Sequence, residues 1–112
     1  MASLTLFVAA VSGFLAVGLG AFGAHGLKAS LPADMMAVYQ TAVQYHFYHC
    51  FALLIVGVLM HSGVQHLSLR ISAVLFFAGT LVFSGSLYAL ALTGTRWLGA
   101  ITPIGGLMFL VA

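Results

Sequence analysis

Long apolar blocks separated by short polar segments set the pattern of this sequence. Apolar residues fill positions 4–27, 38–60 and 71–92, and a fourth apolar block runs from about Leu98 to Ala112. A membrane-spanning helix needs about 20 apolar residues to cross a hydrocarbon core about 30 Å thick. The blocks therefore predict four helices, at about residues 4–27, 36–61, 69–92 and 98–112. They lack the alternation of apolar and polar residues that marks the strands of a transmembrane barrel.

The composition supports a membrane location. Hydrophobic residues make up 63% of the 112 residues, charged residues only 4%, and the mean hydropathy is +1.22. A soluble domain carries about 25% charged residues. No segment remains that could form a separate soluble domain, so the sequence predicts an all-α integral membrane protein with a single transmembrane domain over residues 1–112. The fixed charges all lie between the blocks: Lys28, Asp34, Arg70 and Arg96.

The connections between the blocks are short, which makes consecutive helices antiparallel neighbours. We therefore expect a four-helix antiparallel bundle with short loops. The fourth block is shorter than a full span and lacks a helix stop, so we expect the fourth helix to be truncated at Ala112. The first block lacks the positive n-region of a secretory signal peptide, and we interpret it as a retained helix.

The orientation in the membrane depends on three cations. Lys28 in the first connection and Arg96 in the third lie on one side of the membrane, and Arg70 in the second lies on the other. The positive-inside rule counts Lys and Arg residues near the ends of the spans. The sequence therefore predicts that both termini are outside and that the first and third connections are in the cytoplasm.

Small residues recur at helical spacing within the apolar blocks. Because lipid tails are as apolar as leucine, membrane helices associate through close packing at small residues. Ala9, Gly13, Ala16 and Gly20 follow this spacing in the first block and predict a groove for another helix backbone. We expect a close packing role, within the chain or between chains, for Gly13, Gly20, Gly23, Gly85, Gly105 and Gly106.

Polar side chains gather in the half of each helix that borders the first and third connections. In an antiparallel bundle these halves share one leaflet. Polar groups at membrane depth are costly unless paired, and they usually face a bundle interior or a wet cavity. Two interpretations stay open: a hydrogen-bond network that fixes helix register, and a site for a proton, metal, quinone or haem. The predicted pocket is lined by His25, Gln44, His46, His49, Ser84, Ser86, Tyr88 and Thr102.

One group on the second helix has a spacing that would suit metal ligands. His46 and His49 are three residues apart, and His46 and Cys50 are four apart, so each pair can share a helix face. Imidazole with thiolate suits zinc or copper. No acidic ligand lies within the apolar blocks, so we predict no metal site and keep these three residues as weak candidates. The cofactor stays unknown.

Several function classes find no support in the sequence. It contains no glycine-rich phosphate loop, catalytic triad or pair of carboxylates, and we predict that the chain is not an enzyme. The net charge of +2 comes from too few residues to indicate nucleic-acid binding. The expected partners are the lipid bilayer and either further copies of the chain or a larger membrane complex.

Four short motifs, spread in order along the chain, carry a resemblance to a known family. The chain resembles the YgdD-like small bacterial inner-membrane proteins, which share a domain of unknown function (423) with transmembrane protein 256. This resemblance implies four spans and a location in the bacterial inner (cytoplasmic) membrane, and it implies no settled activity. Family members usually continue through a Gly-Trp-containing end that is absent here. The motifs are Gly20–Leu27, Tyr45–His49, Phe83–Tyr88 and Gly99–Gly106.

Two function hypotheses follow from these observations. The leading hypothesis is a non-enzymatic accessory or structural subunit that packs through its glycine- and alanine-rich helix faces. The alternative is a small oligomeric transporter, channel or ligand carrier that uses the polar pocket. A four-helix protomer is small for a transporter, since many transporters are built from larger inverted repeats.

Overall fold

The computed structural model describes residues 2–27 and 29–112. Lys28, one of the cations on which the predicted orientation depends, lies outside the described residues. Within them the chain forms four helices and no strand, which confirms the all-α prediction. These helices are α1 (Ala2–Phe22), α2 (Ala33–His61), α3 (Leu67–Thr93) and α4 (Thr102–Val111). A π-helical turn, Gly23–Leu27, extends α1, and a 3-10 turn, Arg96–Ala100, precedes α4.

Three helical segments have the length and composition to cross a membrane. They are Ala2–Leu27, Ala33–His61 and Leu67–Thr93, with mean hydropathies of 2.1, 1.5 and 1.8. The fourth apolar segment, Arg96–Val111, is shorter. In an apolar 18-residue stretch of each span, only 17% to 39% of the residues are buried within the chain. Most apolar side chains therefore face outward, as expected where the surroundings are lipid.

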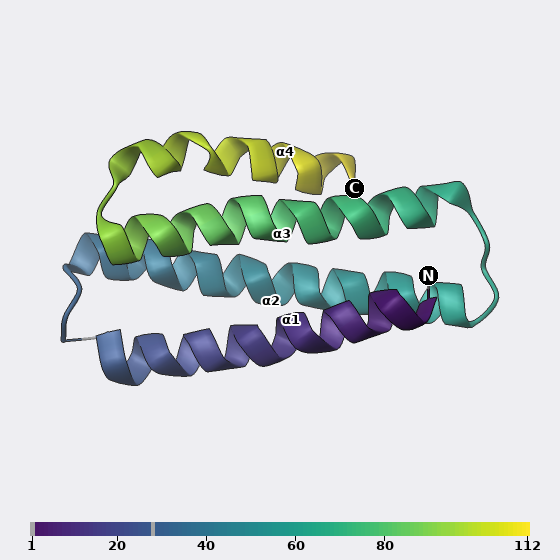
Figure 1. Cartoon of the computed structure of the whole chain (residues 1–112), viewed down its shortest axis with the longest axis horizontal. Coiled ribbons are helices and arrows are strands. Elements are labelled where there is room, and N and C mark those ends of the chain that lie inside the picture. Colours follow the sequence, from purple (N-terminus) through teal and green to yellow (C-terminus); the bar gives the residue numbers. More distant parts are fainter. Residues whose placement is uncertain (1, 28) are drawn as a thin grey trace.

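The helices follow one another in a single antiparallel series (Figure 1). α1 packs against α2, α2 against α3, and α3 against α4, whereas α1 and α4 lie at opposite edges of the described structure. The result is an open, thin molecule with extents of 47 × 27 × 14 Å. Within the described residues, α4 does not return to α1 to close the bundle. Short loops fix each helix beside its predecessor, but they do not bring α4 back to α1.

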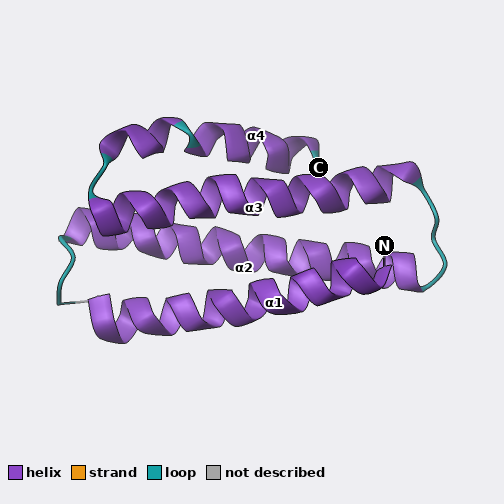
Figure 2. Ribbon diagram, in the orientation of Figure 1, coloured by secondary structure: helices purple, strands orange, loops and turns teal. Residues whose placement is uncertain are grey.

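The first and third connections lie at the same end of the molecule, as antiparallel neighbours require (Figure 2). Asp34 in the first turn of α2 and Arg96 after α3 approach each other, with 3.8 Å between Oδ2 and a guanidinium nitrogen. Both side chains are largely exposed, so this ion pair contributes little to stability in water. The contact shows that the first and third connections lie at the same end of the molecule.

Close helix contacts form where the chain carries glycine. A Cβ atom at Gly23 would collide with the ring of Tyr39, and one at Gly105 would collide with the backbone of Phe83. These contacts join α1 to α2 and α3 to α4. Of the six glycines expected to pack closely, Gly85 differs, because a Cβ there would meet open space. Gly13 lies against Cys50, Gly20 against Val43, and Gly106 against Phe83.

Candidate functional site

A buried histidine joins three helices at the centre of the molecule. His46 on α2 is 6% exposed. Its Nδ1 lies 3.0 Å from the hydroxyl of Tyr88 on α3, and its Nε2 lies 3.0 Å from the hydroxyl of Ser12 on α1. A neutral imidazole donates from one nitrogen and accepts at the other, and each hydroxyl can take either role. Both tautomers of His46 therefore satisfy this three-residue network.

His46 lies near the middle of α2, whereas its partner Tyr88 lies near the C-terminal end of α3. α2 begins at Ala33 and ends at His61, so His46 is about 20 Å from one end and about 22 Å from the other, at a rise of about 1.5 Å per residue. Tyr88 is about 8 Å along α3 from Thr93, the end that borders the third connection. The gathering of the polar residues in one half of the membrane stays a prediction.

Other polar groups on α3 are paired as well. The Ser84 hydroxyl donates to the carbonyl of Ala42 at 2.9 Å, and the Thr80 hydroxyl donates to the carbonyl of Phe76 at 2.7 Å. Ser86 Oγ lies 2.6 Å from Thr102 Oγ1 and joins α3 to α4. Among the described residues, no buried side-chain nitrogen or oxygen lacks a hydrogen-bond partner.

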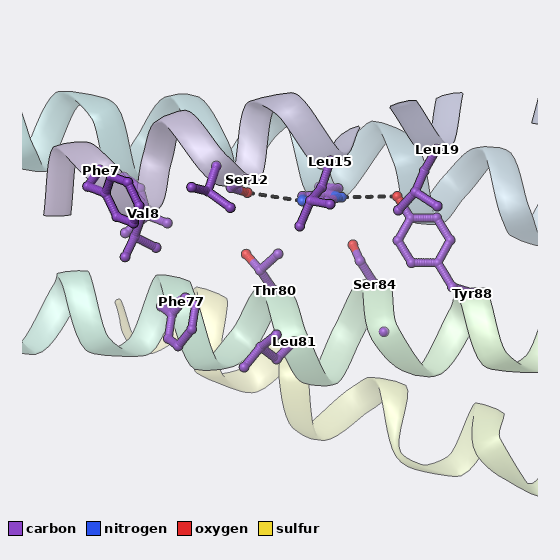
Figure 3. Close-up of a pocket in the computed structure, with 14 residues that line it drawn as sticks. Phe7, Val8, Ser12, Leu15, Leu19, Phe77, Thr80, Leu81, Ser84 and Tyr88 are labelled. Atoms are coloured by element: carbon purple, nitrogen blue, oxygen red, sulfur yellow. Dashed lines mark hydrogen bonds between the residues drawn. The ribbon is translucent and has the colours of Figure 1, made fainter. Parts of the chain in front are cut away.

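A long apolar groove runs between α1 and α3, with α2 as its floor (Figure 3). We call it the α1–α3 groove. Its volume is about 310 Å³. Side chains of Phe7, Val8 and Leu15 come from α1, and those of Phe77 and Leu81 come from α3. The polar residues of its lining are Ser12, His46, Thr80, Ser84 and Tyr88, whose hydrogen bonds to one another or to backbone leave the surface of the groove apolar.

The predicted polar pocket does not form as a single site. His46, Ser84 and Tyr88 line the α1–α3 groove, whereas Gln44 and His25 are exposed elsewhere. The cause is helical periodicity: at about 100° per residue, Gln44 lies on the far side of α2 from His46. Ser86 and Thr102 pair with each other at the α3–α4 contact.

His49 lies about 60° around α2 from His46, in a second groove. We call this the aromatic groove; it has a volume of about 570 Å³ and lies between α2, α3 and α4. The His49 ring stacks on Phe109, with 3.4 Å between centroids and 6° between planes, and it also stacks on Tyr45 at 6.2 Å. Its lining residues are Tyr45, His49, Phe83, Pro103, Gly106, Leu107, Phe109 and Leu110.

The three weak metal candidates face different neighbours. His46 bonds to Ser12 and Tyr88, His49 lies in the aromatic groove, and the Cys50 thiol donates to the carbonyl of Ala9 at 3.2 Å. The described residues include no group of three or more His, Cys, Asp or Glu side chains that could hold a metal ion.

Sequence reasoning missed two residues that matter for these sites. Ser12 completes the His46 network, and Phe109 stacks on His49. Ser12 had a usable signal, since Thr5, Ala9, Ser12 and Ala16 follow one another at three- and four-residue spacing and form the buried stripe of α1. The sequence held no such signal for Phe109, because its contact with His49 depends on how α4 packs against α3.

The apolar spans and the comparisons with known proteins define a membrane protein. The chain matches a family described as a protein of unknown function (DUF423) over residues 19–106. A UPF0382 membrane protein of Bacillus subtilis, YwdK, is 46% identical over 109 residues, which cover 96% of this chain and 87% of the relative. A UPF0382 membrane protein of Staphylococcus haemolyticus is 48% identical over 107 residues, which cover 96% and 86%.

This chain belongs to the DUF423 family. The family resemblance drawn from the four motifs is thereby confirmed. The names of these relatives give a membrane location and no activity. No solved structure matches the chain.

Proposed function

We propose that this chain is a non-enzymatic structural membrane protein that assembles side by side with further copies of itself in the bilayer. The observation that carries this proposal is the open α1–α3 groove, an apolar channel along two helices whose polar groups are already paired. Such a surface suits an apolar helix. It offers no free polar group for a transported ion.

The ridge that fits this groove is the outer face of α4. α4 packs along α3, and its Phe109 ring also stacks on His49 of α2. The outer side chains Ile104, Leu107 and Val111 are 54%, 62% and 67% exposed. They recur at three- and four-residue spacing and form one stripe.

The ridge and the groove also lie at the same depth. Ser86 bonds to Thr102, and Gly79 lies against Phe109, so α4 is level with residues 79–86 of α3. The α3 wall of the groove extends from Phe77 to Tyr88. Copies with the same orientation in a bilayer share one depth, so α4 of one copy meets the groove of the next without tilting. The contact is head-to-tail, and it closes into a ring when the rotation between copies permits.

A leucine placed in the groove tests this proposal. Gly85 lines the groove, and a Cβ there meets no atom within 4 Å, so Gly85→Leu fills the groove without disturbing the fold of one chain. Gly18→Leu is the matched control, because Gly18 on α1 also has open space but lies outside the groove. We expect the wild type and Gly18→Leu to form oligomers in mild detergent and Gly85→Leu to be monomeric by light scattering. A monomeric wild type, or an oligomeric Gly85→Leu, contradicts the proposal.

A further inference from the structure

The aromatic groove contains a histidine nitrogen that the rest of the structure does not use. His49 Nδ1 lies 2.7 Å from the carbonyl oxygen of Tyr45. A carbonyl only accepts hydrogen bonds, so Nδ1 must carry the proton, and in neutral His49 the acceptor is Nε2. Nε2 has no partner among the described residues. Since no buried side-chain nitrogen lacks a partner there, Nε2 must be accessible from outside.

The depth of His49 makes this open acceptor costly. His49 is about 24 Å from the start of α2 at Ala33 and about 18 Å from its end at His61, at a rise of about 1.5 Å per residue. It therefore lies close to the centre of the span, where an unsatisfied polar group costs several kcal/mol in hydrocarbon. The position calls for an occupant that donates a hydrogen bond.

The surrounding rings indicate the shape of that occupant. The His49 ring stacks on Phe109 and on Tyr45. The ring centroid of Phe83 lies 4.9 Å from that of Tyr45. Aromatic walls favour a second flat ring through offset stacking. A water molecule needs two to four polar partners, and the polar side chains of this lining are those of Tyr45 and His49. Lipid headgroups stay at the interface, about 15 Å from the bilayer centre.

We propose that the aromatic groove binds the reduced form of a membrane-soluble quinone, a quinol, with one quinol hydroxyl donating to His49 Nε2. A quinol dissolves at this depth, carries a flat ring and offers a hydroxyl donor. The oxidised quinone has only carbonyl oxygens and cannot donate to Nε2. The groove therefore prefers the reduced ligand to the oxidised one.

Binding measurements on the full chain in phosphatidylcholine nanodiscs test this site, with a decyl-substituted benzoquinol and the matching benzoquinone as probes. The wild type is expected to bind the quinol saturably, about three- to tenfold more tightly than the quinone, as one hydrogen bond provides. His49→Phe keeps a ring to stack on Phe109 and removes the acceptor, so it should lose this preference. Tyr48→Phe, on an exposed tyrosine of α2 outside the groove, should keep it.

Three results overturn the proposal: no saturable binding, equal affinity for the two probes, or an unchanged preference in His49→Phe. A folding defect in His49→Phe is separable, because ¹⁵N-labelled His49 of the wild type gives an independent readout. Its Nε2 resonance should shift on adding quinol and stay in place on adding quinone. A resonance that does not respond to quinol contradicts the site. The α1–α3 groove and the aromatic groove share no lining residue, and Leu107 is the ridge residue that also lines the aromatic groove. A failure of self-assembly would therefore leave the quinol proposal standing.

Discussion

At the scale of single residues, His46 is the polar centre of the molecule. It binds Ser12 on α1 and Tyr88 on α3, so one side chain on α2 sets the register of three helices. The interpretation of the polar residues as a register-fixing network fits this geometry well. Both bonds have an ordinary length of 3.0 Å, and interhelical bonds in membranes contribute about 0.6 kcal/mol each on average.

Replacing His46 with phenylalanine should remove both bonds while keeping a ring of similar breadth. We expect His46→Phe to lower the free energy of unfolding by about 1 to 2 kcal/mol, which is the loss of two such bonds plus a small repacking cost. Tyr48→Phe on the exposed face of the same helix should change it little. Steric-trap unfolding in detergent measures both variants. Equal stability of His46→Phe and wild type would show that the network contributes nothing.

At the scale of helices, α4 is held to α3 by a close backbone approach and two polar contacts. Gly105 lies against the backbone of Phe83, and Thr102 bonds to Ser86. The Ser72 hydroxyl donates to the carbonyl of Ala112 at 2.8 Å and fixes the far end. These contacts position Phe109 against His49 and set the depth of the outer ridge.

A single methyl group at Gly105 should loosen α4. Gly105→Ala forces the helices apart, because a Cβ there overlaps backbone atoms that cannot move aside. Such overpacking costs about 1–3 kcal/mol, so the amides of α4 should exchange hydrogen about tenfold faster or more. Gly106→Ala is the control, since its nearest atoms lie at an ordinary 3.8 Å. Unchanged exchange in Gly105→Ala would mean that α4 does not depend on this contact.

At the scale of the whole molecule, the sequence predicted where the helices form, but it did not predict which faces of those helices pack together. Block length and hydropathy predicted the four helices, because the bilayer imposes a length on each span. The open arrangement was not predictable, since loop length fixes only consecutive neighbours. For the same reason, the sequence could not show that His25 and Gln44 lie apart from His46. Sharing a leaflet does not mean sharing a helix face, and the facing side of α2 emerges only once α1 and α3 are packed on it.

The central claim is that the ridge on α4 of one copy occupies the α1–α3 groove of the next. Disulfide crosslinking between two tagged copies measures this contact, one copy carrying Leu15→Cys in the groove wall and the other Ile104→Cys on the ridge. The native Cys50 is buried. We predict a crosslinked dimer from this pair in native membranes, and none when Val17→Cys, exposed on α1 outside the groove, replaces Leu15→Cys. Equal crosslinking from the two positions, or none from Leu15→Cys, would contradict the account.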